Sequence, residues 1–168
     1  GGNYGFPACS IVDPGKNGVI ILELSSYQLD GAKKLNLDFA SILNITPDHL
    51  DYHGSFEKYI NCKLKIFNFL NKNGTIIFDN KNKLLNKIIN PNNYKSLNFV
   101  KTSNSKNYYA INDNNYLKGN HNSTNASIAI SFAKNLNLKK KEINSAIQSF
   151  KGLPHRMEPL YSSETIQI

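Results

Sequence analysis

The stretch FASILNITPDHLDYHGSFEKYINCKLKIFNFLNKNGTIIFDN (residues 39–80) decides the fold. It opens with the apolar run FASILNI (39–45) and closes with a second run, GTIIFDN (74–80). Strands that are covered on both faces of a parallel sheet have this nearly continuous apolar character. Between the two runs, SFEKYINCKLKIFNFL (55–70) has the spacing of an amphipathic helix. The stretch therefore predicts a βαβ unit with a right-handed crossover.

Short apolar runs alternate with helical segments on both sides of this unit. The run GVIILEL (18–24) precedes it and predicts another strand of the same sheet. Further along the chain we expect helices at 81–90, 121–136 and 139–150, and short strands at 95–101, 107–118 and 164–168. The predicted fold class is α/β, a mostly parallel sheet flanked by helices with a small antiparallel patch.

The bulk composition is that of a globular domain. The chain has 168 residues, of which 40% are hydrophobic and 19% are charged, and no apolar stretch approaches the roughly 20 residues of a membrane span. Cys9 and Cys62 lack CxxC spacing, which favours reduced thiols. The net charge of +8 would attract anions such as nucleotides or nucleic acid. Because the sequence begins with GGNYGFPA and without a methionine, we expect it to be part of a longer protein.

Chemically useful side chains follow two of the predicted strands. Glu23 ends the run 18–24, and His49 follows the run 39–45. In open parallel sheets ligands bind outside the carboxyl ends of the strands. We therefore expect this carboxylate and this imidazole to meet at one rim of the sheet.

The predicted helix 55–70 adds a third group. Lys63 lies inside its apolar stripe, three residues after Ile60 and four before Phe67. An amine on the buried face is costly unless it is paired, extends to water or is modified. As a carbamate, Lys63 would become an anionic oxygen ligand that could share a divalent cation with Glu23 and His49.

Plainer interpretations of these residues stay open at this point. Glu23 could be a capping or ion-paired carboxylate, and Lys63 could simply extend past the stripe to water. His49 and His53 have the spacing of a zinc pair on a helix, but the nearby Pro47 and Gly54 argue against a continuous helix there.

Four motifs together resemble the Mur ligase family. In chain order they are ELSSYQLD (23–30), ILNITPDHLDYHGSFEKYINCKLKIF (42–67), GNHNSTNASIAI (119–130) and GLPHRME (152–158). The resemblance spans nearly the whole chain. It implies the P-loop-NTPase-like central ATP-binding domain of the family at 1–152, followed by a hinge and the start of a C-terminal domain at 153–168.

The resemblance also implies a reaction. Mur ligases form amide bonds in peptidoglycan synthesis with ATP and Mg²⁺, through an acyl phosphate. The forms ELSSYQL and GLPHRME favour the members that add D-glutamate to UDP-N-acetylmuramoyl-L-alanine. This implies a monomeric, cytoplasmic bacterial enzyme with small-molecule substrates, no nucleic-acid partner and no membrane insertion.

Matching motif positions imply roles for individual residues. Glu23 corresponds to a magnesium ligand, His49 to a histidine near a second metal and the substrate, and Lys63 to a carbamylated lysine. Further matches are Asn3 and Ser25 at the muramoyl substrate, Asn122 and Asn125 beside the adenine, and Arg156 near the nucleotide.

One motif of the family is absent from these 168 residues. No G-x-x-x-x-G-K-[ST] phosphate loop occurs in them, so we expect the chain alone to be inactive. The alternatives are another Mur-type amino-acid ligase, a non-catalytic module that binds nucleotide or nucleic acid, and a zinc hydrolase that uses His49 and His53.

Overall fold

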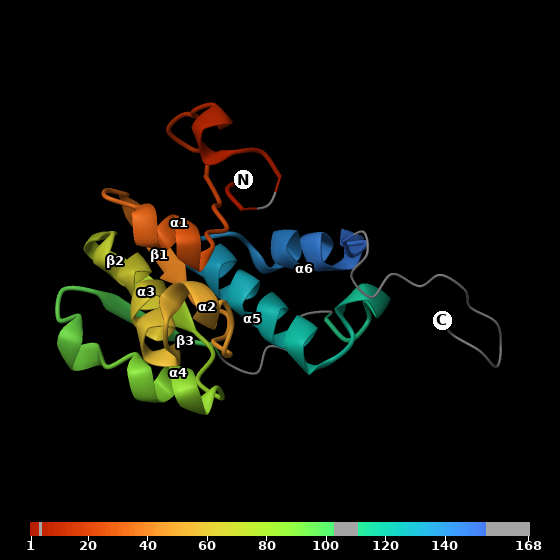
Figure 1. The fold of residues 1–168 in the computed structure, drawn as a ribbon. Coiled ribbons are helices and arrows are strands. Elements are labelled where there is room, and N and C mark those ends of the chain that lie inside the picture. Colours follow the sequence, from red (N-terminus) through yellow and green to blue (C-terminus); the bar gives the residue numbers. More distant parts are fainter. Residues whose placement is uncertain (4, 103–110, 154–168) are drawn as a thin grey trace.

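A computed structural model describes residues 1–3, 5–102 and 111–153. Figure 1 shows a small sheet with helices packed around it and an N-terminal segment that projects from the body. The main elements are, in chain order, α1 (Ser26–Gly31), β1 (Leu37–Ser41), α2 (Leu50–His53), α3 (Phe56–Asn68), β2 (Leu70–Phe78), α4 (Lys83–Ile88), β3 (Asn98–Lys101), α5 (Asn120–Asn135) and α6 (Lys140–Ser149). Short 3₁₀ helices lie at Ala8–Ser10, Pro91–Asn93 and Asn115–Leu117.

The three-stranded sheet has the order β1-β2-β3, and both strand pairs are parallel. This confirms the α/β fold class and the βαβ unit in which α3 connects β1 to β2. The predicted antiparallel patch is wrong for the run 95–101, because β3 pairs parallel to β2 after the crossover through α4. Residues 111–118 form turns and a 3₁₀ helix, and residues 107–110 and 164–168 lie outside the described part of the chain.

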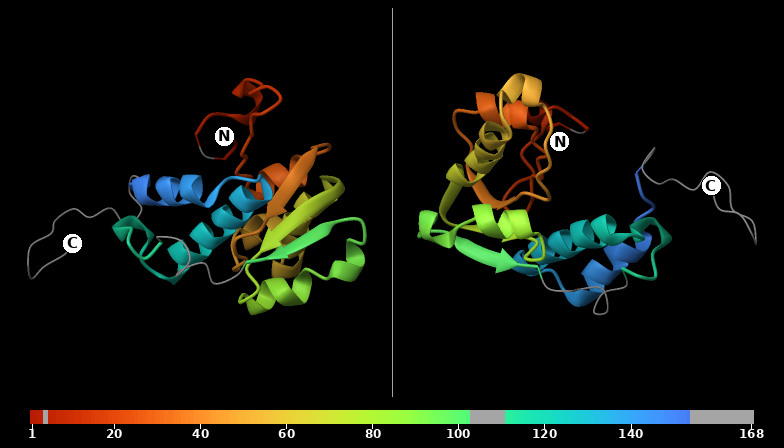
Figure 2. Two further views of the ribbon diagram at one scale, coloured as in Figure 1. Left: turned by 180° about the vertical axis from the view of Figure 1, so that it is seen from behind. Right: turned by 60° about the horizontal axis from the view of Figure 1, so that its bottom comes forward.

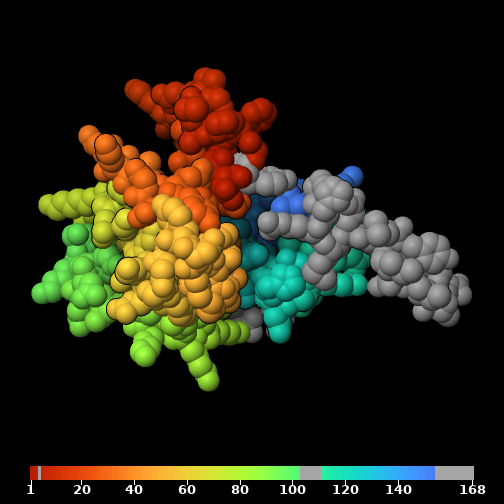
Figure 3. Space-filling model, viewed as in Figure 1, coloured from red at the N-terminus to blue at the C-terminus, as the bar shows by residue number. Residues whose placement is uncertain are grey.

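The run 18–24 is not a strand, which corrects the prediction. Only Glu23 forms an isolated parallel bridge, with Gly2, and the side chains of Ile20 and Ile21 are 49% and 78% exposed. Beta-branched residues form a strand only where a neighbouring strand supplies hydrogen bonds and a surface to pack against. Among the described residues, residues 1–3 form backbone hydrogen bonds with Ile21 and Glu23 of this run. The run is largely exposed. Figure 3 shows the segment at the N-terminus standing out from the body.

Two hydrophobic clusters stabilise the fold. The larger lies between the sheet and α3 and α4, where Phe67, Ile76 and Leu85 are at most 1% exposed. On the other side of the sheet α5 contacts β2, and the ring of Phe132 lies 5.9 Å from that of Phe39. Figure 2 shows α5 and α6 side by side, away from α3 and α4.

The second cluster joins α5 to α6. Its buried residues are Ile111, Ala126, Ile130, Ile143 and Ile147. The Asn114 side chain links the segment before α5 to the end of α6. Its amide donates to the carbonyl oxygens of Ile147 and Phe150 at 2.6 and 2.8 Å. In the part of the chain described, no helix has both the length and the apolar character that crossing a membrane requires.

Candidate active site

Glu23 is positioned by backbone pairing with the first residues of the chain. Its N–H donates to Gly1, and its carbonyl oxygen accepts from the N–H of Asn3 at 2.7 Å. This pairing brings the two side chains together, so that Asn3 Nδ2 donates to Glu23 Oε1 at 3.3 Å. Both side chains are exposed. Glu23 therefore presents a solvent-accessible carboxylate oriented by an amide, although it does not end a strand as the sequence predicted.

Ser25 is the N-cap of α1 and forms a capping box with Gln28. The Ser25 hydroxyl accepts from the Gln28 N–H at 3.2 Å, and the Gln28 side chain accepts from the Ser25 N–H at 2.9 Å. These bonds satisfy two of the free donors at the helix N-terminus. Ser25 thus has a structural role that the sequence analysis did not assign to it.

His49 is the N-cap residue directly before α2, and its backbone is left-handed with φ of 52°. Its N–H donates to Asp48 Oδ1 at 2.9 Å, and its imidazole Nε2 lies 3.5 Å from Asp48 Oδ2. Its ring also lies 4.9 Å from that of Tyr27 in α1. The imidazole is therefore fixed at the surface between a carboxylate and an aromatic ring.

Lys63 lies on α3, where its amine donates to the Tyr59 hydroxyl at 3.2 Å. The side chain is partly buried, as the apolar stripe predicted, and Tyr59 itself is 5% exposed. The hydroxyl of Tyr59 could equally donate to an oxygen on a modified Lys63, since a phenol both donates and accepts.

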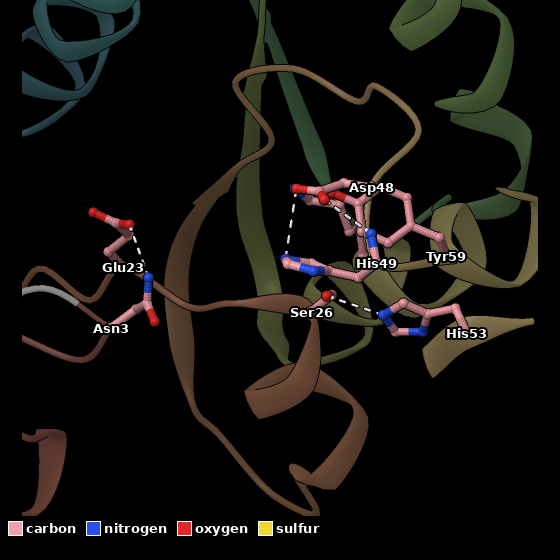
Figure 4. A network of polar contacts seen from close by, with 8 residues as sticks. Asn3, Glu23, Ser26, Asp48, His49, His53 and Tyr59 are labelled. Carbon is pink, nitrogen blue, oxygen red and sulfur yellow. Dashed lines mark hydrogen bonds and ion pairs between the residues drawn. The ribbon is translucent and has the colours of Figure 1, made fainter. Parts of the chain in front are cut away.

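Glu23, His49 and Lys63 are each held by a different local partner. Figure 4 shows Asn3 and Glu23 facing each other, apart from the group that contains Asp48, His49 and Tyr59. Within residues 1–3, 5–102 and 111–153, no three His, Cys, Asp or Glu side chains lie close enough to hold a metal ion together. The geometry gives no support to a zinc site at His49 and His53.

A buried polar group next to His49 escaped the sequence analysis. His53 Nε2 lies 3.0 Å from the hydroxyl of Ser26, and the Cys62 thiol donates to the Ser26 carbonyl oxygen at 3.1 Å. Burial raises the pKa of the Cys62 thiol, so it stays protonated and acts as a packing residue. Only the spacing of His49 and His53 hinted at this group, because the contacts join three separate helices.

The expected nucleotide residues lie elsewhere on the fold. Asn122 and Asn125 are one turn apart near the start of α5. The side-chain amide of Asn122 donates to the carbonyl oxygen of Lys118 at 3.0 Å, and Asn125 is exposed. Arg156 lies outside the described residues.

Comparison with known proteins now identifies the family. The Mur ligase middle domain matches residues 8–148. The chain belongs to the Mur ligase family. Relatives named UDP-N-acetylmuramoylalanine--D-glutamate ligase include those of Leptospira interrogans, 36% identical over 94% of this chain, and Zymomonas mobilis, 36% identical over 95%. That of Rickettsia bellii is 34% identical over 98% of this chain.

The fold and the extent of the match agree with this assignment. The crystal structure of MurF from Acinetobacter baumannii aligns with a TM-score of 0.58 at 17% identity, covering 76% of this chain and 32% of MurF. The chain spans 36% to 41% of the length of the three relatives.

Proposed function

We propose that the chain is the central ATP-binding part of a ligase that joins D-glutamate to UDP-N-acetylmuramoyl-L-alanine. The observation that carries the proposal is the similarity of almost the whole chain to ligases of that name, at 31% to 36% identity in relatives from several bacteria. In this proposal residues 1–152 form the ATP-binding domain, and residues 153–168 lead into the next domain. The enzyme works in the bacterial cytoplasm, as a monomer, in peptidoglycan synthesis.

The reaction needs activation because a carboxylate is a poor electrophile. Transfer of the γ-phosphoryl group of ATP to the substrate carboxylate makes an acyl phosphate and releases ADP. The amine of D-glutamate then attacks the acyl carbon and loses a proton. Phosphate then leaves and the amide remains. Charge builds up on the phosphoryl oxygens, so cationic groups near them lower the barrier.

The assigned residues divide this work. Asn3 and Ser25 orient the muramoyl substrate beside Glu23. Asn122, Asn125 and Arg156 hold the adenine nucleotide, with the two asparagine amides suited to hydrogen bonds with the base. His49 contacts substrate at the rim, where Asp48 fixes its ring.

Magnesium fits these residues only as separate, sparsely ligated ions, because Glu23 faces Asn3 apart from His49 and Tyr59 (Figure 4). The exposed Glu23 carboxylate would supply oxygen to one ion, and the carbamate proposed at Lys63 would supply oxygen to another, with His49 as a further candidate ligand. Mg²⁺ typically takes one or two carboxylates and completes its shell with water and phosphate oxygens. When bound, it would neutralise charge on the phosphoryl groups.

The test uses the full-length protein that contains this chain. With ATP, Mg²⁺ and UDP-N-acetylmuramoyl-L-alanine, we expect release of phosphate only when D-glutamate is added. A panel with L-alanine, L-lysine, meso-diaminopimelate and D-alanyl-D-alanine tests the alternative that another Mur-type acceptor is used. Phosphate release that follows one of these instead would reject the D-glutamate assignment.

A second measurement addresses the metal. We expect Glu23→Gln to lower turnover at limiting Mg²⁺ by about 10-fold or more, because it removes a charged ligand. Asp13→Asn, another exposed carboxylate change near the N-terminus, is the matched control. Equal effects of the two substitutions would remove Glu23 from the site.

A further inference from the structure

Side chains of two adjacent residues at the start of α1, Ser26 and Tyr27, contact residues of α2 and its N-cap. Ser26 bonds to His53 through their side chains at 3.0 Å, and the ring of Tyr27 lies 4.9 Å from that of His49. Ser26 directly follows Ser25, which we assign to substrate binding. The first turn of α1 is thus connected to both ends of α2, and Figure 4 shows Ser26 and His53 facing each other.

The helix α2 needs such support because it is a single turn. It has four residues and is bounded by two left-handed residues, His49 with φ of 52° and Gly54 with φ of 77°. A short isolated turn is unstable in water, and the left-handed region is costly for a residue with a side chain. Within the turn, His53 N–H donates to the His49 carbonyl oxygen at 3.0 Å. His53 therefore contacts His49 through its backbone and Ser26 through its imidazole.

The Ser26–His53 bond is shielded from water. Ser26 is 4% exposed and His53 is 8% exposed. The rings of Tyr52 and Tyr59 lie 4.8 and 5.3 Å from the imidazole and flank it. If one partner of a buried hydrogen bond is removed, the other keeps the cost of an unsatisfied polar group. This bond consequently favours one arrangement of α1 and α2 over others.

We propose that Ser26 and His53 are a positioning pair. Their bond holds the His49 ring against Tyr27 and fixes the position of His49 relative to Ser25. The inference rests on the proposed function, in which Ser25 and His49 both meet the substrate. Neither Ser26 nor His53 touches the reacting atoms. The pair acts by fixing the left-handed backbone of His49, and with it the direction of the imidazole.

The kinetic test uses four variants of the full-length protein and one control variant. Ser26→Ala and His53→Phe remove the bond, and the double variant tests whether the two act as one unit. His53→Gln keeps a polar group at the position of Nε2. Ile143→Val, in the cluster between α5 and α6, controls for a general loss of stability.

We expect Ser26→Ala and His53→Phe each to lower kcat by about 10- to 100-fold, as loss of groups that orient a ligand does elsewhere. The KM for ATP should stay within about 3-fold, because the assigned adenine residues lie on α5. The double variant should lose no more than the worse single variant, and His53→Gln should recover most of the activity. Unchanged kcat in His53→Phe, or additive losses, would overturn the proposal.

A spectroscopic test separates this proposal from the ligase assignment. In NMR spectra of the same protein, the ¹³C shifts of His49 report its backbone conformation, and nuclear Overhauser effects report the Tyr27–His49 contact. We expect both signatures in wild type and His53→Gln, and their loss in His53→Phe. Their persistence in His53→Phe would overturn the pair, whereas normal signatures in a wild-type protein without ligase activity would reject only the proposed function.

Discussion

Lys63 is the residue whose chemical form matters most. Its amine lies against the hydroxyl of Tyr59, and the side chain is partly buried on α3. A free ammonium there makes one hydrogen bond and a cation–π contact with the ring of Tyr59, whose centroid is 5.2 Å away. A carbamate would instead accept from the same hydroxyl and present oxygen atoms to a cation. The Tyr59 hydroxyl can pair with either form, so an activity measurement with added carboxylates is needed to tell them apart.

We predict that Lys63→Ala lowers the ligase activity of the full-length protein by about 100-fold or more, because it removes a charged group from the transition-state site. Short carboxylates such as acetate should partly restore activity, since they supply the oxygen atoms of the missing carbamate. The measurement is phosphate release with and without added acetate.

Lys58→Ala is the matched control, because Lys58 is an exposed lysine on the same helix. We expect it to retain activity within about 2-fold and to show no response to acetate. A fully active Lys63→Ala variant, or equal rescue of both variants, would contradict the carbamate.

At the scale of elements, the long helices were the most predictable, whereas the short helices α1 and α2 were not predicted. Spacing alone located α3, α5 and α6 to within a few residues, because an apolar stripe and an N-cap such as Ser55 are encoded locally. The run 18–24 has the composition of a strand but not its surroundings. Pairing and burial come from distant segments, which no local pattern contains.

The same limit applies to the candidate site. The motifs located Glu23, His49 and Lys63 in the sequence, but they did not reveal that each has its own local partner. The Ser26–His53 bond joins residues 27 apart, and its existence depends on how α1 and α2 both pack against α3. Contacts of this kind follow from tertiary packing, and the spacing of residues in the sequence does not predict them.

The exposed run gives a direct test of the fold. We predict that Ile21→Thr changes the free energy of unfolding by less than about 0.5 kcal/mol, because the side chain is already 78% exposed. Ile77→Thr, at a position with 0% exposure in β2, should cost at least about 2 kcal/mol through lost packing and a buried hydroxyl. Urea unfolding of the 168-residue chain measures both values. A loss of several kcal/mol from Ile21→Thr would show that the run is a buried strand after all.

An ion pair connects α1 to α3 and makes stability depend on pH. Lys65 Nζ lies 2.6 Å from Asp30 Oδ1, and this hydrogen bond is the main reason that the pKa of the Asp30 carboxyl is lowered. A group with a lowered pKa in the folded state stabilises it above the unfolded value of about 3.9, and this stabilisation is lost as the pH falls through the folded value. The same bond raises the pKa of Lys65. The stabilisation by the ion pair is therefore lost at alkaline pH only above the unfolded lysine value of about 10.4.

We therefore predict that Asp30→Asn lowers stability by a constant amount between about pH 5 and 9. The difference from wild type should shrink as the pH falls below about 4, and vanish only below the lowered pKa of Asp30 in the folded state. The effect will be small, because both side chains are about 40% exposed and surface pairs are screened by water and salt. Urea unfolding at pH 7, 5 and 3 provides the comparison, with Asp38→Asn as the control for loss of another exposed carboxylate. A difference that persisted unchanged at pH 3 would assign the effect to something other than the ion pair.

At the scale of the whole molecule, the chain joins a sheet unit to a pair of helices. The cluster around Phe67 and the cluster around Ile143 are separate cores, and α5 connects them by packing on the sheet as well as on α6. Of the proposed substrate residues, Ser25 and His49 lie beside the helices that pack on α3, and the proposed adenine residues Asn122 and Asn125 lie near the start of α5. The interface between α5 and β2 consequently sets the distance between the two halves of the proposed site.

This arrangement leads to a prediction about the chain itself. ATP-binding proteins of this type hold the phosphates in a glycine-rich loop with an invariant lysine, and no G-x-x-x-x-G-K-[ST] occurs in the 168 residues. Without that loop the γ-phosphoryl group lacks the donors that would orient it for transfer. We expect the 168-residue chain to fold, with a cooperative thermal transition, but to release no phosphate above buffer when it is given ATP, Mg²⁺, UDP-N-acetylmuramoyl-L-alanine and D-glutamate. The full-length protein, assayed in parallel, should turn over under the same conditions. Turnover by the isolated chain would mean that other residues, among them the lysines that give it a net charge of +8, replace the phosphate loop.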